Sequence, residues 1–251
     1  MTSAPQVCFV HGFLGDRHDW DPVRDQLAND VRCMPLELPG HGSAGSALEI
    51  EGDTLERAAD QLAVRARGMA VVGYSMGGRL ALLAAARSPT AFSHLLLIGA
   101  DPGIESAAAR QGRARADDAL AARLTTLDGG GFRQFLTEWY AAPLFGDLRR
   151  RAGFEELLLR RLAHSPASVA VALRALSVGR QPSLWPALLS VGQPTMYLVG
   201  SQDAKYTAVA ERIRDSGAPI DVHSVPGAAH ALHREDPRAV ASRLLALLGR
   251  P

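Results

Sequence analysis

Gly73-Tyr74-Ser75-Met76-Gly77 stands between a short apolar run, residues 69–73, and an alanine- and leucine-rich segment, residues 76–87. This pattern predicts a strand before the pentapeptide and a helix after it. A serine on such a tight turn needs small residues two positions away on either side, and glycines occupy both places. The backbone N–H of Met76 then points to where negative charge would develop on a bound molecule. We therefore interpret Ser75 as a catalytic serine and Met76 as an oxyanion donor.

The alternation of short apolar runs and helical patterns continues on both sides of this motif, which predicts βαβ units and a parallel sheet. Expected strands cover residues 7–10, 31–38, 69–73, 94–99, 195–200 and 220–225, and expected helices cover 54–66, 76–87 and 237–248. After residue 100 the strand signal disappears, and Arg, Ala and Leu recur at helical spacing. We expect an α/β fold with a mostly parallel sheet flanked by helices, formed by a core (1–100 and 187–251) and a helical cap insertion (101–186).

A serine hydroxyl is a weak nucleophile and a weak base, so it needs an imidazole partner. In a strand–turn–helix site of this kind the chain order is Ser, then Asp or Glu, then His. Asp203 follows the expected strand that ends at residue 200, and His230 follows the strand that ends near residue 225. Both would lie at the same edge of the sheet as Ser75, where the carboxylate can fix the imidazole tautomer. The sequence predicts a Ser75–His230–Asp203 triad on an α/β-hydrolase fold.

His233 is a rival to His230, although it could also be a surface histidine on the next turn. A metal site formed by these two histidines and Asp203 has no second cluster of ligands to support it, so we expect no metal ion and no cofactor.

Two further loops flank the expected strands. His11-Gly12-Phe13 follows the first strand and should supply a second oxyanion donor, the N–H of Phe13. Leu38-Pro39-Gly40-His41-Gly42 follows the second strand, and we interpret it as a structural turn; His41 is a weaker candidate base.

Composition argues against several other classes of protein. The net charge is +1, from 27 basic and 26 acidic residues, so no overall field favours nucleic acid or a membrane surface. No stretch approaches the roughly 18 consecutive apolar residues of a membrane span, and residues 1–6 lack the features of a signal peptide. The two cysteines lie in apolar runs and favour free thiols. We expect a cytoplasmic protein that acts on a small molecule, as a monomer or weak homo-oligomer.

Several stretches from Val7 to the closing helix resemble one family of this fold. They are His11-Gly12-Phe13-Leu14-Gly15 with Trp20, Leu38-Pro39-Gly40-His41-Gly42, Gly73-Tyr74-Ser75-Met76-Gly77-Gly78-Arg79, Phe135-Leu136-Thr137-Glu138-Trp139-Tyr140 with Pro143-Leu144-Phe145, and Leu176-Ser177-Val178-Gly179-Arg180-Gln181-Pro182. Together they resemble the MenH family, the 2-succinyl-6-hydroxy-2,4-cyclohexadiene-1-carboxylate synthases of menaquinone biosynthesis. The resemblance implies a lyase in which Ser75, relayed through His230, acts as a general base and pyruvate leaves without an acyl-enzyme.

The resemblance also implies which residues bind the substrate, which carries several carboxylates. These residues are Tyr74, Arg79, Arg113, Trp139 and Arg161. A planar guanidinium can hold a carboxylate through two bonds, which suits a polyanion. Arg161 is adjacent to Arg160, and we expect only one of the two to face inward.

The triad alone does not distinguish the lyase from several other functions. An esterase, a thioesterase or a carbon–carbon bond hydrolase would use the same three residues, and a non-catalytic binding protein could keep the fold. The arginines favour the lyase, because a neutral ester does not need three buried cations.

Lys205, the only lysine, lies two residues after Asp203. Either base composition of the genome or a need for a compact ammonium at the pocket mouth explains it.

Overall fold

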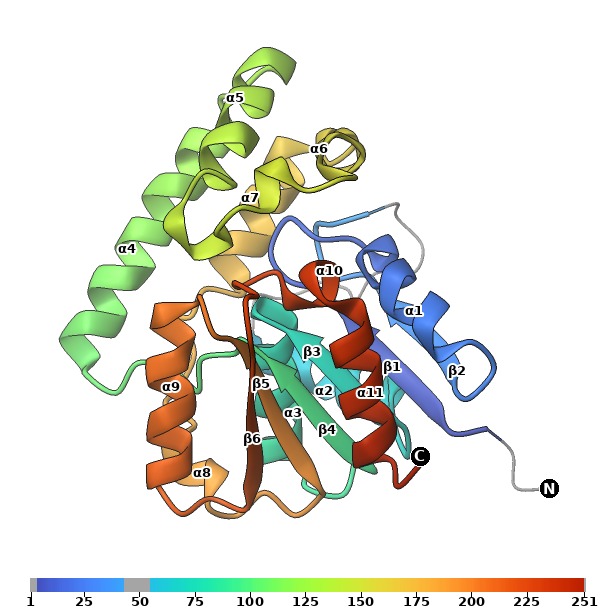
Figure 1. The fold of residues 1–251 in the computed structure, drawn as a ribbon. Coiled ribbons are helices and arrows are strands. Elements are labelled where there is room, and N and C mark those ends of the chain that lie inside the picture. Colours follow the sequence, from blue (N-terminus) through green and yellow to red (C-terminus); the bar gives the residue numbers. More distant parts are fainter. Residues whose placement is uncertain (1–3, 43–54, 251) are drawn as a thin grey trace.

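A six-stranded sheet forms the centre of the computed structural model, which describes residues 4–42 and 55–250 (Figure 1). The strand order is β2-β1-β3-β4-β5-β6, and every neighbouring pair is parallel. The strands are β1 (Gln6–Val10), β2 (Arg32–Leu36), β3 (Ala70–Tyr74), β4 (His94–Ile98), β5 (Thr195–Gly200) and β6 (Ile220–Val225). The parallel sheet predicted from the apolar runs is confirmed. Central strands β3 and β5 are buried along their whole length, as continuous apolar strands between two helical layers should be.

Helices cover both faces of the sheet. One layer contains α2 (Leu55–Arg65), α3 (Met76–Arg87), α8 (Trp185–Leu188) and α9 (Ala204–Asp215), and the other contains α1 (Asp21–Leu27) and α11 (Pro237–Leu247). Leu80, Leu95 and Tyr197 are fully buried under the first layer. Trp20 and Leu244 are fully buried under the second layer. The helix expected over residues 54–66 is present from residue 55 onward; residue 54 lies outside the described part of the chain.

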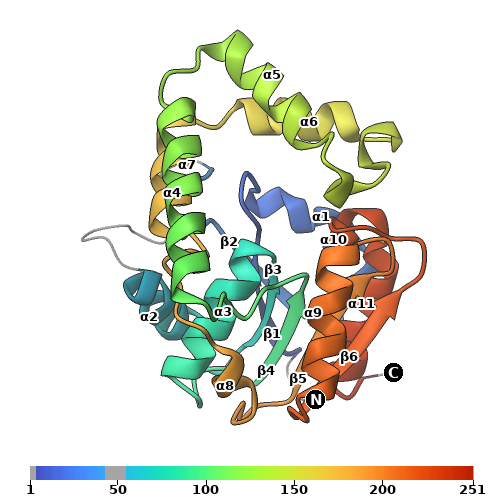
Figure 2. The same cartoon turned by 90° about the vertical axis from the view of Figure 1, so that its left-hand side faces the viewer.

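Most of the chain between β4 and β5, from α4 to α7, forms a helical layer above the carboxyl ends of the strands (Figures 1 and 2). It contains α4 (Ala107–Leu124), α5 (Gly129–Trp139), η2 (Pro143–Phe145), η3 (Leu148–Arg150), α6 (Phe154–Leu162) and α7 (Pro166–Ala175). Its apolar cluster includes Phe132, Leu136 and Val169, and Leu14 of the core joins the same cluster. The described residues between β4 and β5 hold no strand.

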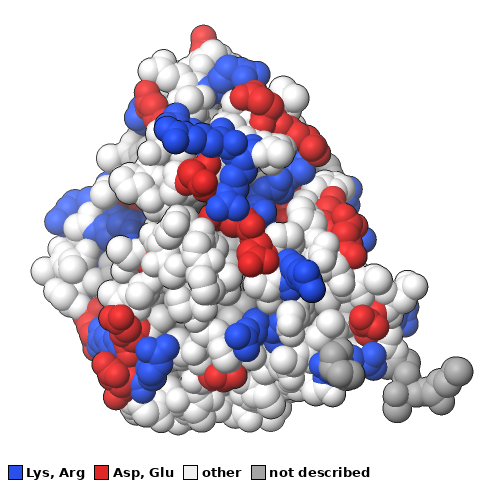
Figure 3. All heavy atoms as spheres, viewed as in Figure 1, with Lys and Arg blue, Asp and Glu red and all other residues white. Residues whose placement is uncertain are grey.

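Two short helical turns complete the loops at this edge of the sheet: η1 (Arg17–Trp20) follows β1, and α10 (Leu232–Glu235) follows β6. On the face seen in Figure 3, basic and acidic side chains lie side by side, without a broad patch of one sign. Within residues 4–42 and 55–250, no helix is long and apolar enough to cross a membrane. Cys8 and Cys33 are free thiols, the first buried and the second partly exposed.

Candidate active site

Ser75 joins β3 to α3 in a backbone conformation that few non-glycine residues adopt, with φ 50° and ψ −111°. Its N–H donates to the carbonyl of Ile98 at 2.8 Å, which holds the turn over the sheet. A Cβ added to Gly73 would meet the Cα of Gly78 at 2.6 Å, and a Cβ added to Gly77 would collide with the carbonyl oxygen of Val10. The small residues of the motif are therefore required by close packing of α3 against the strands.

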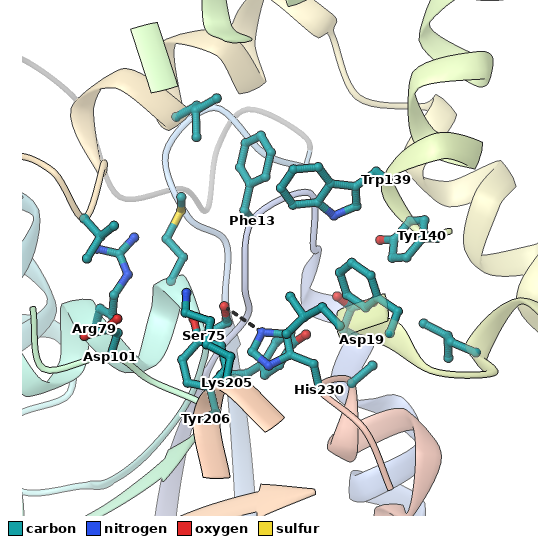
Figure 4. A pocket seen from close by; sticks show the side chains of 18 of the residues that line it. Phe13, Asp19, Ser75, Arg79, Asp101, Trp139, Tyr140, Lys205, Tyr206 and His230 are labelled. Atoms are coloured by element: carbon teal, nitrogen blue, oxygen red, sulfur yellow. Dashed lines mark hydrogen bonds between the residues drawn. The ribbon is translucent and has the colours of Figure 1, made fainter. Parts of the chain in front are cut away.

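The histidine and aspartate predicted from chain order meet this serine. His230 Nε2 lies 3.1 Å from Ser75 Oγ (Figure 4). His230 Nδ1 lies 2.7 Å from Asp203 Oδ2. Asp203 is also the N-cap of α9, where Oδ1 accepts a bond from Tyr206 N at 3.1 Å. A neutral His230 that carries its proton on Nδ1 donates to Asp203 and accepts the Ser75 hydroxyl proton on Nε2.

Burial lowers the pKa of His230 below its ordinary value of 6.5, because removal from water disfavours the charged imidazolium. The hydrogen bond and negative charge of Asp203 raise the pKa but do not outweigh burial, and the cation of Lys205 lowers it further. The imidazole is therefore neutral, and able to accept a proton, at neutral pH.

Activity should accordingly persist as the pH falls to 6.5 and decline only below it. We expect the acidic limb of the kcat/KM profile to have its midpoint under 6.5. Lys205→Met removes a cation near the ring and should move this midpoint upward. A pH profile of both proteins between about pH 4.5 and 8.5 checks this; a midpoint above 6.5 in the parent, or a downward shift in the variant, would contradict it.

The loop that carries Phe13 is held rigidly beside the serine. A Cβ added to Gly12 would lie 3.3 Å from Ser75 Cβ, so the two loops are in close contact. Leu14, which has a positive φ of 61°, donates its N–H to His41 Nε2 at 3.0 Å. Its carbonyl oxygen lies 3.2 Å from His164 Nε2, a histidine of the cap. His41 thus positions the backbone, in agreement with the structural turn expected at residues 38–42.

A cavity of about 280 Å³ opens between the sheet edge and the cap, and Ser75 and His230 lie in its wall. The five predicted substrate-binding residues all line it: Tyr74, Arg79, Arg113, Trp139 and Arg161. Figure 4 shows Arg79 and Asp101 on one side of Ser75, and Asp19, Trp139 and Tyr140 on the other. The ring of Tyr74 packs against that of His230, with centroids 5.0 Å apart. Trp139 packs against Phe13 at 5.4 Å.

Arg79 is a buried cation whose hydrogen-bond acceptors are uncharged. Its guanidinium donates to Gln181 Oε1 at 2.8 Å and to the carbonyl of Leu176 at 2.7 Å. Burial lowers its pKa to about 10, so the group stays charged at neutral pH. A buried charge without a counter-ion is unfavourable unless a bound anion completes it.

Arg113 and Arg161 are less available than Arg79 to bind an anion, because each is already paired with a carboxylate. Arg113 is half-exposed and its Nε donates to Asp117 at 2.9 Å. Arg161 is buried and donates to Asp16 and Asp19, and Arg160 bonds the same two carboxylates. Only Arg161 of the adjacent pair lines the cavity, whereas Arg160, which is 23% exposed, reaches the same two carboxylates from the last turn of α6 without lining it.

His233 is also not a surface residue. It is buried between the rings of Tyr74 and Trp20, at 4.3 and 5.0 Å, and burial lowers its pKa to about 3. The ring of His233 therefore contacts these aromatic side chains, whereas the hydrogen bond with Ser75 is made by His230.

Lys205 lines the cavity and lies at its rim, where its side chain is exposed. Its Nζ is 4.8 Å from the ring centroid of Tyr206, and that ring stacks on His230 at 4.6 Å. No motif or spacing in the sequence indicated Tyr206, Asp19 or Arg234, which also line the cavity.

A serine on a strand–turn–helix elbow, bonded to a histidine and through it to an aspartate above a parallel sheet, defines the α/β-hydrolase class. The chain matches the alpha/beta hydrolase family over residues 9–243. A 2-succinyl-6-hydroxy-2,4-cyclohexadiene-1-carboxylate synthase of Yersinia pseudotuberculosis serotype O:1b (strain IP 31758) is 34% identical over 252 residues, which are 98% of this chain and 88% of that protein. Protein PHYLLO, chloroplastic, of Arabidopsis thaliana is 30% identical over 96% of this chain, which spans only 15% of that much longer protein.

Among solved structures, MenH from S. aureus superimposes with a TM-score of 0.90 at 27% identity, covering 99% of this chain and 95% of that one. The chain belongs to the alpha/beta hydrolase family and, within it, to the family of the 2-succinyl-6-hydroxy-2,4-cyclohexadiene-1-carboxylate synthases. The fold class and the family resemblance predicted from the sequence are both confirmed.

Proposed function

We propose that the chain eliminates pyruvate from 2-succinyl-5-enolpyruvyl-6-hydroxy-3-cyclohexene-1-carboxylate to give 2-succinyl-6-hydroxy-2,4-cyclohexadiene-1-carboxylate, a step of menaquinone biosynthesis. One observation carries this proposal: Arg79 is buried, forms no salt bridge with a carboxylate among residues 4–42 and 55–250, and lines the same cavity as the Ser75–His230 pair. A substrate with several carboxylates supplies the missing negative charge, whereas a neutral ester does not. The names of the relatives reported above support the same reaction.

The triad would act as a base in this reaction. Ser75 Oγ takes the ring proton at C2, next to the succinyl ketone, while its own proton passes to His230 Nε2. The electron pair left at C2 forms a C2=C3 bond, the C3=C4 pair moves to C4=C5, and the C5–O bond breaks. Enolpyruvate leaves, takes the proton from His230 and becomes pyruvate. Asp203 stabilises the transient imidazolium, and no bond forms between Oγ and carbon.

Two backbone N–H groups would stabilise the charge that develops on the ketone oxygen. Met76 is the first residue of α3, so its N–H has no partner within the helix and lies at the positive end of the helix dipole. Phe13 lies on the loop packed against Ser75. Such donors act on the transition state more than on the ground state, because the charge is greatest there.

The cap, residues 101–186, would form the remaining wall of the substrate site through Arg113, Trp139 and Arg161. We further propose that the enzyme works in the cytoplasm on a free small molecule. Its near-neutral charge gives it no general attraction to nucleic acid or membranes. The direct test is to mix the purified protein with the enolpyruvyl substrate and to follow pyruvate and the diene absorbance together; no pyruvate release would refute the proposed function.

Arg79→Met should weaken substrate binding strongly. Loss of a charge-assisted bond to a carboxylate is worth about 1.5–3 kcal/mol, so kcat/KM should fall roughly 10- to 150-fold, mostly through KM. Steady-state kinetics with the enolpyruvyl substrate measures this.

Arg79→Lys provides the control for charge, since it keeps the cation but loses the planar fork, and its KM should lie between those of the parent and Arg79→Met. Hydrolysis of a small neutral ester, where it is detectable, should change little in either variant. Equal damage to both activities would mean that the bonds from Arg79 to Gln181 and Leu176 serve the fold and not the substrate.

A further inference from the structure

The end of the cavity opposite Arg79 contains a buried ion cluster, formed by Asp16, Asp19, Arg160 and Arg161. Arg161 donates to Asp16 Oδ2 at 2.8 Å and to Asp19 Oδ1 at 2.5 Å. Arg160 donates to the same two oxygens at 3.2 and 3.1 Å. The two carboxylates and two guanidiniums therefore neutralise one another.

Each nitrogen of the Arg161 guanidinium already donates a hydrogen bond to another residue of the protein. Its Nε donates to Tyr140 Oη at 3.0 Å, and each terminal nitrogen already bonds a carboxylate. Its positive charge is thus compensated before any substrate enters. This makes Arg161 a poorer anion site than Arg79, although both line the cavity.

Arg234, on α10, is a third arginine near the ion cluster, and it takes no part in the hydrogen bonds of that cluster. Its side chain is only 14% exposed and lines the cavity, and its Nη1 is 3.8 Å from Asp19 Oδ1, beyond hydrogen-bond distance. Within the described residues this buried Nη1 has no hydrogen-bond partner.

Neighbouring groups do not neutralise Arg234. The adjacent Glu235 accepts a bond from Ala229 N at 2.9 Å and pairs with Arg151 at 3.4 Å. His233, on the other side, is buried and neutral. Glu156, which pairs with Arg160 at 3.7 Å, is largely exposed. Arg160, Arg161 and Arg234 therefore outnumber the buried carboxylates of Asp16 and Asp19 by one, and Nη1 of Arg234 has no acceptor among the described residues. A buried donor of this kind is unfavourable unless a ligand supplies the acceptor.

We propose that Arg234 binds a carboxylate of the substrate, and that Arg161 is a positioning residue that holds Asp19 beneath Arg234. This rests on the proposed function and extends it. The cavity then has an anion-binding end on each side of Ser75, Arg79 on one side and Arg234 on the other. It would select a molecule that carries carboxylates on both sides of the proton to be removed.

Arg234→Met tests the proposal, with Arg151→Met as the matched control. Arg151 also bonds α10, through the carbonyl and carboxylate of Glu235, but does not line the cavity. We expect Arg234→Met to raise KM for the enolpyruvyl substrate about tenfold or more, with a smaller change in kcat. Arg234→Lys should recover part of the loss, and Arg151→Met should leave KM within about threefold of the parent.

Succinate binding gives a second readout that needs no turnover. Titration of the parent with this dianion should show binding that Arg234→Met weakens about tenfold and Arg151→Met does not. If Arg234→Met matches Arg151→Met in KM and in succinate affinity, the inference is wrong even though the parent releases pyruvate. If the parent neither releases pyruvate nor binds succinate, the proposed function fails first, and the inference fails with it.

Discussion

Ser75→Ala should lower turnover of the enolpyruvyl substrate by about 10³-fold or more. The variant removes the hydroxyl oxygen that lies 3.1 Å from His230 Nε2 and lines the cavity. Alanine keeps the same Cβ in the same left-handed conformation, so the melting temperature should stay close to that of the parent. Steady-state kinetics and thermal unfolding together measure this.

Ser88→Ala provides the matched control, because Ser88 ends the same helix, α3, away from the cavity. Its turnover should equal that of the parent. A Ser75→Ala variant that retains near-normal turnover would remove this serine from the chemistry and leave His230 to act on the substrate directly.

Asp203→Asn should be nearly as damaging, with a loss of about 10³- to 10⁴-fold in kcat. An amide can donate to His230 Nδ1, which places the imidazole proton on Nε2, and the nitrogen that faces Ser75 then no longer accepts a proton. Asparagine is as good an N-cap as aspartate, so α9 should remain formed through its bond to Tyr206 N. The loss should therefore appear in kcat and not in stability.

Asp236→Asn makes the same chemical change at another N-cap, that of α11, where Asp236 accepts a bond from Ala239 N at 2.9 Å. Its kinetics should match those of the parent. Similar losses in both variants would indicate that Asp203 acts through the fold and not through His230.

Much of the fold, and the residues of the triad, could be predicted from local patterns in the sequence. Strands β1, β3, β4 and β5 are mainly apolar runs, β2 and β6 are more mixed, and the expected ends of all six lie within two residues of the observed ends. Asp203 and His230 could be found because carboxyl ends of parallel strands meet at one edge of the sheet. Gly73 and Gly77 also helped to identify Ser75 as the catalytic serine, because the close packing of these two positions against Gly78 and Val10 leaves no room for a side chain.

The far end of the cavity could not be predicted in this way. Asp16 and Arg161 are separated by 145 positions in the chain, and no local pattern indicates that η1 and α6 meet. Arg234 lies on a helix of four residues, too short for any periodicity, so its burial depends on tertiary packing. The same holds for His233, which lies between aromatic rings from separate elements.

A single-turnover experiment tests the central claim, that Ser75 acts as a base and forms no covalent intermediate. Enzyme in excess is mixed rapidly with the enolpyruvyl substrate and quenched at intervals, and pyruvate, diene and intact protein mass are measured in each sample. We expect pyruvate and diene to appear at the same rate in a ratio of one to one, with the mass of the protein unchanged throughout. A substrate-derived adduct on Ser75 that forms and decays at a rate matching turnover would contradict the account and assign the chain to the acyl-transfer hydrolases.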